Sequence, residues 1–311
     1  MTLPRLVLVL SENWTLTPPR DLRALVRLAV EAEDAGIDAV MVSEHVVLGR
    51  GADAGGVPSN PRDYALPGNQ DPATPWPSSL VVLSAVAAAT TRLRLVAGAI
   101  IAPLRHPLLL AKDLATLDLL AKGRLVVQPT VSLHEAEYEA VGVPFHARGE
   151  LLDEHLAAWD VLWRESPASF EGRHYRFSDV YLEPKPCRPG GPILWFGGSS
   201  LHERLLRRIV AYGRGFNPLG SPKPEELERL AAAMASAGRD MSELELVGGT
   251  RGTFPDAVSV ADLGRALESV PAQLERGFTT ICFKPSQFTD DPRQVGRLCR
   301  EIAARVAALA G

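Results

Sequence analysis

The chain has 311 residues, of which 46% are hydrophobic and 23% are charged, and its formal net charge at pH 7 is -4. This balance is typical of a folded globular protein, and the length allows one large hydrophobic core or two smaller ones. The negative net charge, with 33 Lys and Arg residues scattered along the chain, argues against a nucleic-acid-binding surface.

The lengths of the apolar stretches and the number of cysteines indicate in which cellular compartment the protein is expected. The stretches from Leu6 to Leu10 and from Leu80 to Ala89 are shorter than a signal-peptide core or the ~20 residues that span a bilayer. Three cysteines without metal-ligand spacing (Cys187, Cys282 and Cys299) suggest neither a disulfide framework nor a zinc site. We expect a cytoplasmic enzyme with no metal, no nucleic-acid partner and no membrane partner.

The apolar pattern predicts strands that alternate with helices along the whole chain. Strands are expected at Leu3–Leu10, Asp38–Val42, Leu93–Ala97, Arg124–Gln128, Ile193–Phe196, Gly215–Phe216, Glu245–Gly248 and Thr279–Phe283. Helices are expected at Pro18–Asp34, Ser78–Thr90, His106–Ala121, Glu150–Arg164, Ser200–Ala211, Lys223–Ala237, Val260–Leu274 and Asp291–Ala310. This order predicts an α/β fold, a single (β/α)8 TIM barrel over residues 1–311. The alternative, a doubly wound open sheet, typically has fewer strands and a glycine-rich first turn.

Two segments are long for barrel connections and are expected to be rim insertions, at residues 46–76 and 165–192. The first follows a strand, so it is expected at the end of the barrel where active sites are built. The second contains Phe170–Phe177, which predicts a β-hairpin.

Residues that follow the strands of a barrel converge on one site. Glu44 and His45 follow the second predicted strand. Histidine titrates near neutral pH and is the usual donor or acceptor for a proton that moves with a hydride. The dipeptide fits equally well with a histidine that is hydrogen-bonded for structure alone.

Two further groups of residues have open interpretations. Gly197-Gly198-Ser199 predicts either a phosphate seat before a helix or a tight turn with Ser199 or Ser200 as the helix cap. His134-Glu135-Ala136-Glu137 contains residue types that bind metals, but its spacing fits no metal motif, so a rim loop with polar contacts is expected.

A set of segments occurs in the order known from one protein family. They are Ala32–His45, Thr91–Ala99, Arg105–Pro107, Leu109–Asp118, Gly123-Arg124, Glu137, Gly142–Phe145, Arg148, Asp153-Glu154, Pro184–Pro186, Gly197-Gly198 and Gly215–Pro218. Each is weak alone, but the ordered set resembles the bacterial luciferase-like family of flavin- and F420-dependent (β/α)8 oxidoreductases.

This resemblance implies a reduced flavin or deazaflavin across the strand ends, supported by a non-proline cis peptide near Gly98-Ala99. It implies that His45 is the catalytic residue that handles the proton, with Glu44 tuning or orienting it. The expected cofactor contacts are Ala97, Gly98, Ala99, Gln128, Thr130, Ser132, Gly197, Gly198 and Ser199. The expected substrate contacts are Trp14, Trp76 and His134, with the 46–76 loop and the Phe170–Phe177 hairpin as the wall or lid.

One stretch departs from the family. The family commonly has a Gly-Val-Gly-x-Gly-Trp run where this chain has Gln128-Pro-Thr-Val-Ser-Leu133. Pro129 removes a backbone donor, and the lost glycines restrict close approach of the backbone to a ligand. Side chains of Gln128, Thr130 and Ser132 are expected to supply hydrogen bonds instead. Leu133 also replaces a glutamate of the sugar-phosphate-oxidising relatives, which argues against their substrate here.

The sequence thus predicts an oxidoreductase that uses F420 for hydride transfer to or from a small organic substrate. Two alternatives stay open: an FMN-dependent monooxygenase that uses O2, and a non-catalytic ligand-binding barrel with an altered cofactor site. F420 and FMN share a tricyclic ring and a phosphate, so the sequence separates them poorly. The resemblance also implies a homodimer.

Overall fold

The strands close into a barrel. The computed structural model describes residues 3–66 and 68–311, and within them eight parallel strands follow the order β1-β10-β9-β8-β7-β4-β3-β2. They are β1 (Arg5–Val9), β2 (Ala39–Val42), β3 (Arg94–Ile101), β4 (Leu125–Thr130), β7 (Ile193–Phe196), β8 (Gly215–Phe216), β9 (Glu245–Gly249) and β10 (Thr280–Phe283). The predicted (β/α)8 architecture is confirmed.

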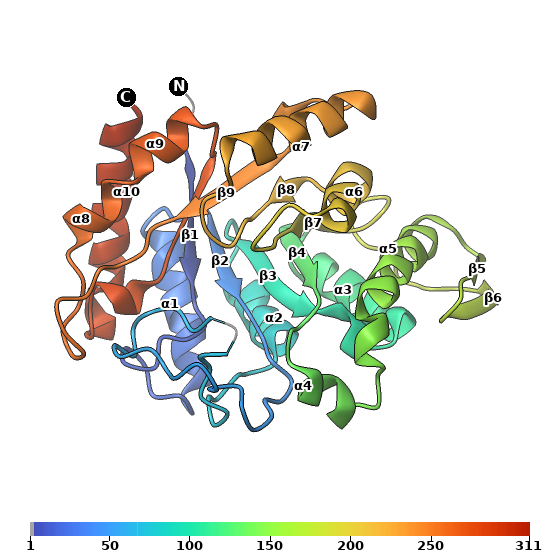
Figure 1. The fold of residues 1–311 in the computed structure, drawn as a ribbon, viewed down its shortest axis with the longest axis horizontal. Helices are drawn as coiled ribbons and strands as arrows, with labels where there is room; N and C mark the ends of the chain where they lie inside the picture. Colours follow the sequence, from blue (N-terminus) through green and yellow to red (C-terminus); the bar gives the residue numbers. More distant parts are fainter. Residues whose placement is uncertain (1–2, 67) are drawn as a thin grey trace. The chain divides into compact units, whose positions relative to one another are not determined.

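The helices follow the strands along the chain (Figure 1). They are α1 (Leu22–Asp34), α2 (Ser79–Ala89), α3 (Pro107–Leu120), α4 (Glu135–Ala140), α5 (Arg148–Arg164), α6 (Glu203–Tyr212), α7 (Pro224–Ser236), α8 (Leu263–Leu267), α9 (Val270–Glu275) and α10 (Val295–Ala310). No helix in the described part of the chain has the length and apolar run needed to cross a membrane.

Contacts group the chain into two compact units. The first unit contains the residues up to 41, residues 59–64 and residues from 194 onward, and the second contains residues 42–58 and 65–193. The long loop after β2 therefore contributes to both units. Each unit is described below by itself.

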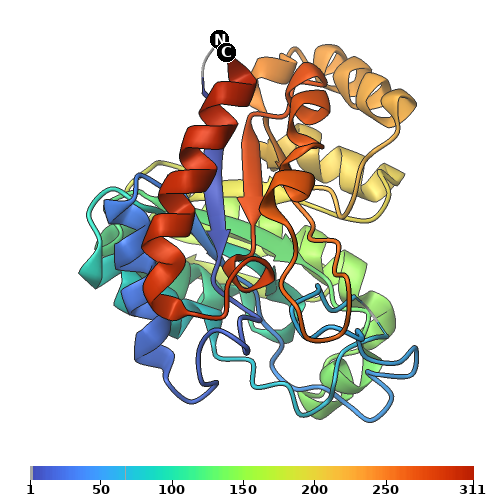
Figure 2. The ribbon, with the colours of Figure 1, turned by 90° about the vertical axis from the view of Figure 1, so that its left-hand side faces the viewer.

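The first unit is built around β1, which pairs with β10 on one side and β2 on the other. Figure 2 shows β1 and β10 side by side, with Val7 opposite Cys282 in the register. Val7, Leu8 and Phe283 are completely buried, as expected for strands covered on both faces. Helix α1 buries Leu25, Leu28, Ala29 and Ala32 and packs against α10.

The second unit pairs β3 with β4, and the pairing contains an irregularity. The register shifts between Gly98 and Ile100, so Ala99 is an extra residue where β4 has Pro129. Proline has no N–H to donate to the ladder, which is consistent with a bulge at this point. Both strands extend beyond the predicted ends, to Ile101 and Thr130.

The outer helices of the second unit are joined by two tryptophans. Nε1 of Trp159 donates to the Pro107 carbonyl and Nε1 of Trp163 to the Ala111 carbonyl, each at 3.2 Å, which fixes α5 on α3. The predicted hairpin is present as β5 (Ala168–Glu171) and β6 (Arg176–Val180). Its turn is held by the Glu154 carboxylate on α5, which accepts the backbone N–H groups of Arg173, His174 and Tyr175.

Some predicted helix boundaries were wrong, for identifiable reasons. The helix expected at Val260–Leu274 is two short helices, α8 and α9, because Pro271 has no N–H and its ring would clash with the preceding turn of a continuous helix. Helix α1 begins at Leu22 rather than Pro18, since Asp21 caps the backbone N–H of Ala24. The short helix α4 was not predicted.

Candidate functional site

His45 lies just after β2 and is the centre of a polar cluster in the second unit. Its Nδ1 lies 3.3 Å from Oε2 of Glu137, and its Nε2 lies 3.0 Å from Nε2 of Gln70. The rings of Trp76 and His134 approach it edge-on, with centroids 5.1 and 5.2 Å away. The imidazole is only 15% exposed, so it is held from several sides and partly shielded from water.

Glu137 is the acid that contacts His45. Its side chain is fully buried in the first turn of α4, and its Oε1 accepts the backbone N–H of Val46 at 2.7 Å. Burial raises the pKa of this carboxyl, but hydrogen bonds from His45 and Ser132 outweigh it, so the pKa of Glu137 lies below its usual range. A carboxylate here can only accept hydrogen bonds, and it orients the imidazole.

Glu44 has a different role from the one predicted. Its buried carboxylate accepts from both terminal nitrogens of Arg105, at 2.7 and 3.1 Å. It also accepts from Ser79 Oγ at 2.7 Å and from the backbone N–H of Ile101 at 3.2 Å. With these four donors the carboxylate joins β2, β3 and α2. The expectation that Glu44 orients His45 is therefore corrected: that contact is made by Glu137.

Two of the three predicted substrate residues, Trp76 and His134, belong to the same cluster as His45. Nε2 of His134 lies 2.5 Å from Oε1 of Gln70, which thereby bridges the two histidines. Burial and the neighbouring His45 lower the pKa of His134. The third predicted residue, Trp14, is half-buried in the first unit.

The strand ends of the second unit hold six of the predicted cofactor contacts. The peptide bond Gly98–Ala99 is cis, as the resemblance implied. Ala99 and Thr130 are half-buried, whereas Ala97 and Gln128 are buried. Ser132, also buried, bonds to Glu137, and its Oγ accepts the backbone N–H of His134. Gly98, between Ala97 and Ala99, is buried as well.

The other predicted cofactor contacts follow β7 in the first unit. Gly197 and Gly198 are half-buried and Ser199 is exposed. Helix α6 begins only at Glu203, and its cap is His202, whose ring accepts the N–H of Leu205. The alternative in which Ser199 or Ser200 caps this helix is therefore wrong.

The first unit also contains a buried cation that the sequence did not single out as a site residue. Lys284, at the end of β10, is completely buried, and its Nζ donates to the Asp63 carbonyl at 3.1 Å and lies 5.2 Å from the centre of the Tyr64 ring. Burial lowers the pKa of Lys284, and the charges of Glu12 and Asp63 oppose this shift.

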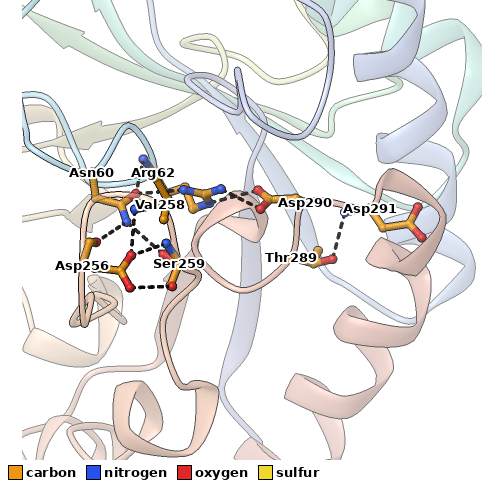
Figure 3. A network of polar contacts seen from close by, with 8 residues as sticks. All are labelled: Asn60, Arg62, Asp256, Val258, Ser259, Thr289, Asp290 and Asp291. Carbon is orange, nitrogen blue, oxygen red and sulfur yellow. Dashed lines mark hydrogen bonds and ion pairs between the residues drawn. The ribbon is translucent and has the colours of Figure 1, made fainter.

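A cavity of about 550 Å³ in the first unit is lined by Ser59, Asn60 and Asp63 of segment 59–64 and by residues 251–257. Figure 3 shows how this segment is anchored. The side-chain amide of Asn60 donates to the carbonyls of Asp256 and Ser259, at 2.9 Å each. Arg62 forms a two-pronged ion pair with Asp290, at 2.9 and 2.6 Å.

Gln70 and Arg105 are the principal site residues that sequence reasoning missed. Gln70 lies in a loop without periodicity, so no pattern pointed to it. Arg105 was noted only within a family segment; its pairing with Glu44 is a contact across 61 residues of sequence. No group of three or more His, Cys, Asp or Glu residues in the described ranges is arranged to hold a metal ion.

Comparisons with known proteins agree with this architecture. The family model described as luciferase-like monooxygenase matches residues 3–254. The Mycobacterium tuberculosis protein named Uncharacterized protein Rv0953c is 31% identical over 251 residues, which cover 78% of this chain and 82% of that protein. The FMNH2-dependent dimethylsulfone monooxygenase of Pseudomonas putida is 33% identical over 136 residues, or 43% of this chain and 37% of the monooxygenase.

Solved structures share the fold at low identity. Monooxygenase RslO1 from Streptomyces bottropensis superposes with a TM-score of 0.72 at 20% identity, over 99% of this chain and 100% of that one. The coenzyme F420-dependent tetrahydromethanopterin reductase from Methanopyrus kandleri superposes with a TM-score of 0.67 at 13% identity, over 98% and 100%. With a closed barrel, a histidine at the end of β2 and a family match over most of its length, the chain belongs to the luciferase-like monooxygenase family.

Proposed function

We propose that this protein is an F420-dependent oxidoreductase that transfers a hydride to or from a small organic substrate. The observation that carries the proposal is the position of His45, which follows a barrel strand and is held by the buried Glu137 carboxylate. Such a histidine is suited to move a proton next to a hydride transfer. The F420-dependent reductase from Methanopyrus kandleri, which has the same fold over nearly all of this chain, supports the choice of cofactor.

The residues at the strand ends fit a phosphate-bearing tricyclic cofactor. In the second unit, the small or polar Ala99 and Thr130 are partly accessible to a ring. In the first unit, Gly197, Gly198 and Ser199 leave accessible backbone that suits a phosphate. Within the second unit, Ala99 and Thr130 would hold the ring, which carries the hydride when it is bound.

The chain's own contribution is to hold and shield the proton-transfer group. Glu137 orients the imidazole of His45, and the Trp76 ring covers one of its sides. A positioned acid or base of this kind contributes a factor of about 100 to 10,000 to a reaction rate.

A second candidate function is an FMN-dependent monooxygenase that uses O2. It is favoured by a specific observation, the identity to the FMNH2-dependent dimethylsulfone monooxygenase of Pseudomonas putida. The same residues would serve, since both cofactors carry a tricyclic ring and a phosphate.

We also propose that the protein is a homodimer that binds no nucleic acid and no membrane. The homodimer is supported by α2, whose outer face is apolar: Val81, Ala85, Ala88 and Ala89 are all exposed. A helix that is apolar on all sides is normally covered on all sides.

Titration of the purified protein with F420 and with FMN, followed by ring fluorescence, tests the two cofactors directly. Micromolar or tighter binding of F420 with no comparable binding of FMN is the expected result. Preferential binding of FMN would replace the first proposal by the second, with oxygen consumption as the next assay. Binding of neither would overturn both and favour a ligand-binding barrel.

A further inference from the structure

A chain of hydrogen-bond contacts in the second unit links four side chains: Glu137, His45, Gln70 and His134. The contacts measure 3.3 Å from Glu137 to Nδ1 of His45, 3.0 Å from Nε2 of His45 to the Gln70 amide, and 2.5 Å from that amide to Nε2 of His134. His45, Gln70 and His134 can each donate or accept at the linking atoms. Which atom donates in each hydrogen bond therefore depends on the fourth side chain.

Glu137 is the one of these four side chains that cannot donate a hydrogen bond. Its ionised carboxylate can only accept, and the N–H of Val46 already fixes Oε1 at 2.7 Å, which turns Oε2 toward His45. Nδ1 of His45 must therefore carry a proton. A neutral imidazole has only one N–H, so Nε2 is then a lone-pair acceptor.

The donors and acceptors in the other two hydrogen bonds follow from the side-chain amide of Gln70. Nε2 of His45 accepts, so the NH2 group of Gln70 faces it, and the carbonyl of Gln70 faces His134. Nε2 of His134 must then carry its proton. In the reverse arrangement, the unprotonated Nδ1 of His45 would face the Glu137 carboxylate, and two acceptors would oppose each other in a buried place.

We propose that Glu137 is the positioning residue that fixes the proton of His45 on Nδ1, and that the Gln70 amide transmits this choice to His134. Nε2 of His45 is thereby the nitrogen left to accept a proton. The catalytic significance of this arrangement rests on the proposed function, in which His45 handles the proton; the direction of the chain does not.

Nitrogen NMR of histidine-labelled protein reads the tautomer of each ring directly. Variants lacking His45 or His134 assign the signals. In the unmodified chain at neutral pH we expect a protonated Nδ1 and an unprotonated Nε2 for His45, and a protonated Nε2 for His134. A His45 ring protonated on Nε2, or on both nitrogens, would overturn the proposal, and this measurement needs no variant that must fold.

Glu137→Gln reverses the chain if the proposal is right. The N–H of Val46 keeps the new amide oxygen in place, so the NH2 group faces Nδ1 of His45. Both histidines should then exchange their protonated nitrogen. Glu135→Gln is the matched control: it makes the same chemical change two residues away on the exposed side of α4 and should leave both rings unchanged. Unchanged rings in a folded Glu137→Gln protein would refute the role of Glu137.

Gln70→Met tests the transmission step. In the double variant Glu137→Gln/Gln70→Met, His45 should still change its tautomer while His134 no longer follows it. Asp71→Asn, the exposed neighbour in the same loop, is the control that should preserve the coupling. If His134 followed His45 without Gln70, the amide would not be the transmitter. If the protein shows these tautomers but binds neither F420 nor FMN, the proposal for Glu137 and Gln70 stands and only the proposed function is overturned.

Discussion

Oε1 of Glu44 lies 2.7 Å from Nη1 of Arg105 while its Oε2 lies 3.1 Å from Nη2, so the two side chains form a two-pronged ion pair. The carboxylate is 1% exposed and the guanidinium 24%. Removing one partner of a buried pair leaves the other charge without compensation, which costs more than the intact pair contributes.

Glu44→Gln should therefore lower the free energy of unfolding by about 3 kcal/mol. The matched control is Asp160→Asn, which breaks the exposed pair between Arg164 and Asp160, at 2.6 Å, and should cost less than about 1 kcal/mol. Urea denaturation measures both from the midpoint at constant slope. Equal losses in the two variants would contradict the structural role assigned to Glu44.

The fold could be predicted from the sequence because its signals are local. Short apolar runs of two to eight residues predicted the strands, and their alternation with helices predicted the barrel. The helix predicted at Val260–Leu274 is divided at Pro271, because proline can begin a helix but cannot continue one. The short helix α4 was missed because six residues carry too little periodicity to register.

The candidate site could be predicted only in part. His45 was found because it follows a strand, and the strand order is visible in the sequence. Its partners are 25 and 92 residues away, and no local pattern identifies Gln70 or Glu137 as the side chains that reach it. The role expected for Glu44 came from the family's acid-histidine pair, whereas its actual partner, Arg105, lies 61 residues away and no local pattern identifies it.

Gly49 lies against α4, where a methyl group has no room. A Cβ atom on Gly49 would lie 2.3 Å from the Cβ of Ala136. Gly49→Ala should therefore destabilise the protein by about 1 to 3 kcal/mol through overpacking. Adding Ala136→Gly removes the opposing methyl group, so the double variant should be more stable than the sum of the single changes implies.

A second glycine provides the control for this experiment. Gly296 lies in α10, and a Cβ there would meet only ordinary contacts of 3.7 Å or more. Gly296→Ala should raise stability by about 0.5 to 1 kcal/mol, because alanine loses less backbone freedom in a helix. Additive effects of Gly49→Ala and Ala136→Gly in thermal unfolding would show that the two residues are not in contact.

Stability should rise with pH between about pH 4 and pH 7, because the pKa values of His134 and Glu137 are both lower in the folded protein. Each group binds fewer protons when folded than when unfolded. The contribution of His134 is complete above its ordinary value of 6.5 and is lost as the pH falls through the lowered value; that of Glu137 behaves in the same way below 4.5.

Urea unfolding at a series of pH values checks this dependence. His134→Gln should reduce the slope of the free energy of unfolding against pH just below pH 6.5. The control is His146→Gln, on the turn before α5, which should keep a steeper slope in that range than His134→Gln. A stability that falls from pH 5 to pH 7 would contradict the direction of both shifts.

The exposed apolar face of α2 predicts self-association. Val81 is 69% exposed on this face, and Val81→Glu should convert a dimer to a monomer, because the charge would lose its hydration in the contact. Val258→Glu is the control, since that side chain is 75% exposed on a loop of the first unit. Light scattering after size-exclusion chromatography measures the mass. A monomeric unmodified protein would remove the dimer proposal.

His45→Ala separates proton transfer from cofactor binding. We expect turnover with a substrate found in an F420-dependent screen to fall by about 100- to 10,000-fold, since the positioned proton carrier is lost. The dissociation constant for F420 should change by less than about tenfold, or about 1.4 kcal/mol, because the imidazole is held by Glu137 and Gln70 and the cofactor is assigned to other residues. His146→Ala, away from the cluster, should preserve both quantities. Comparable turnover in His45→Ala would refute the catalytic assignment, and a parallel loss of binding would make His45 a cofactor ligand instead.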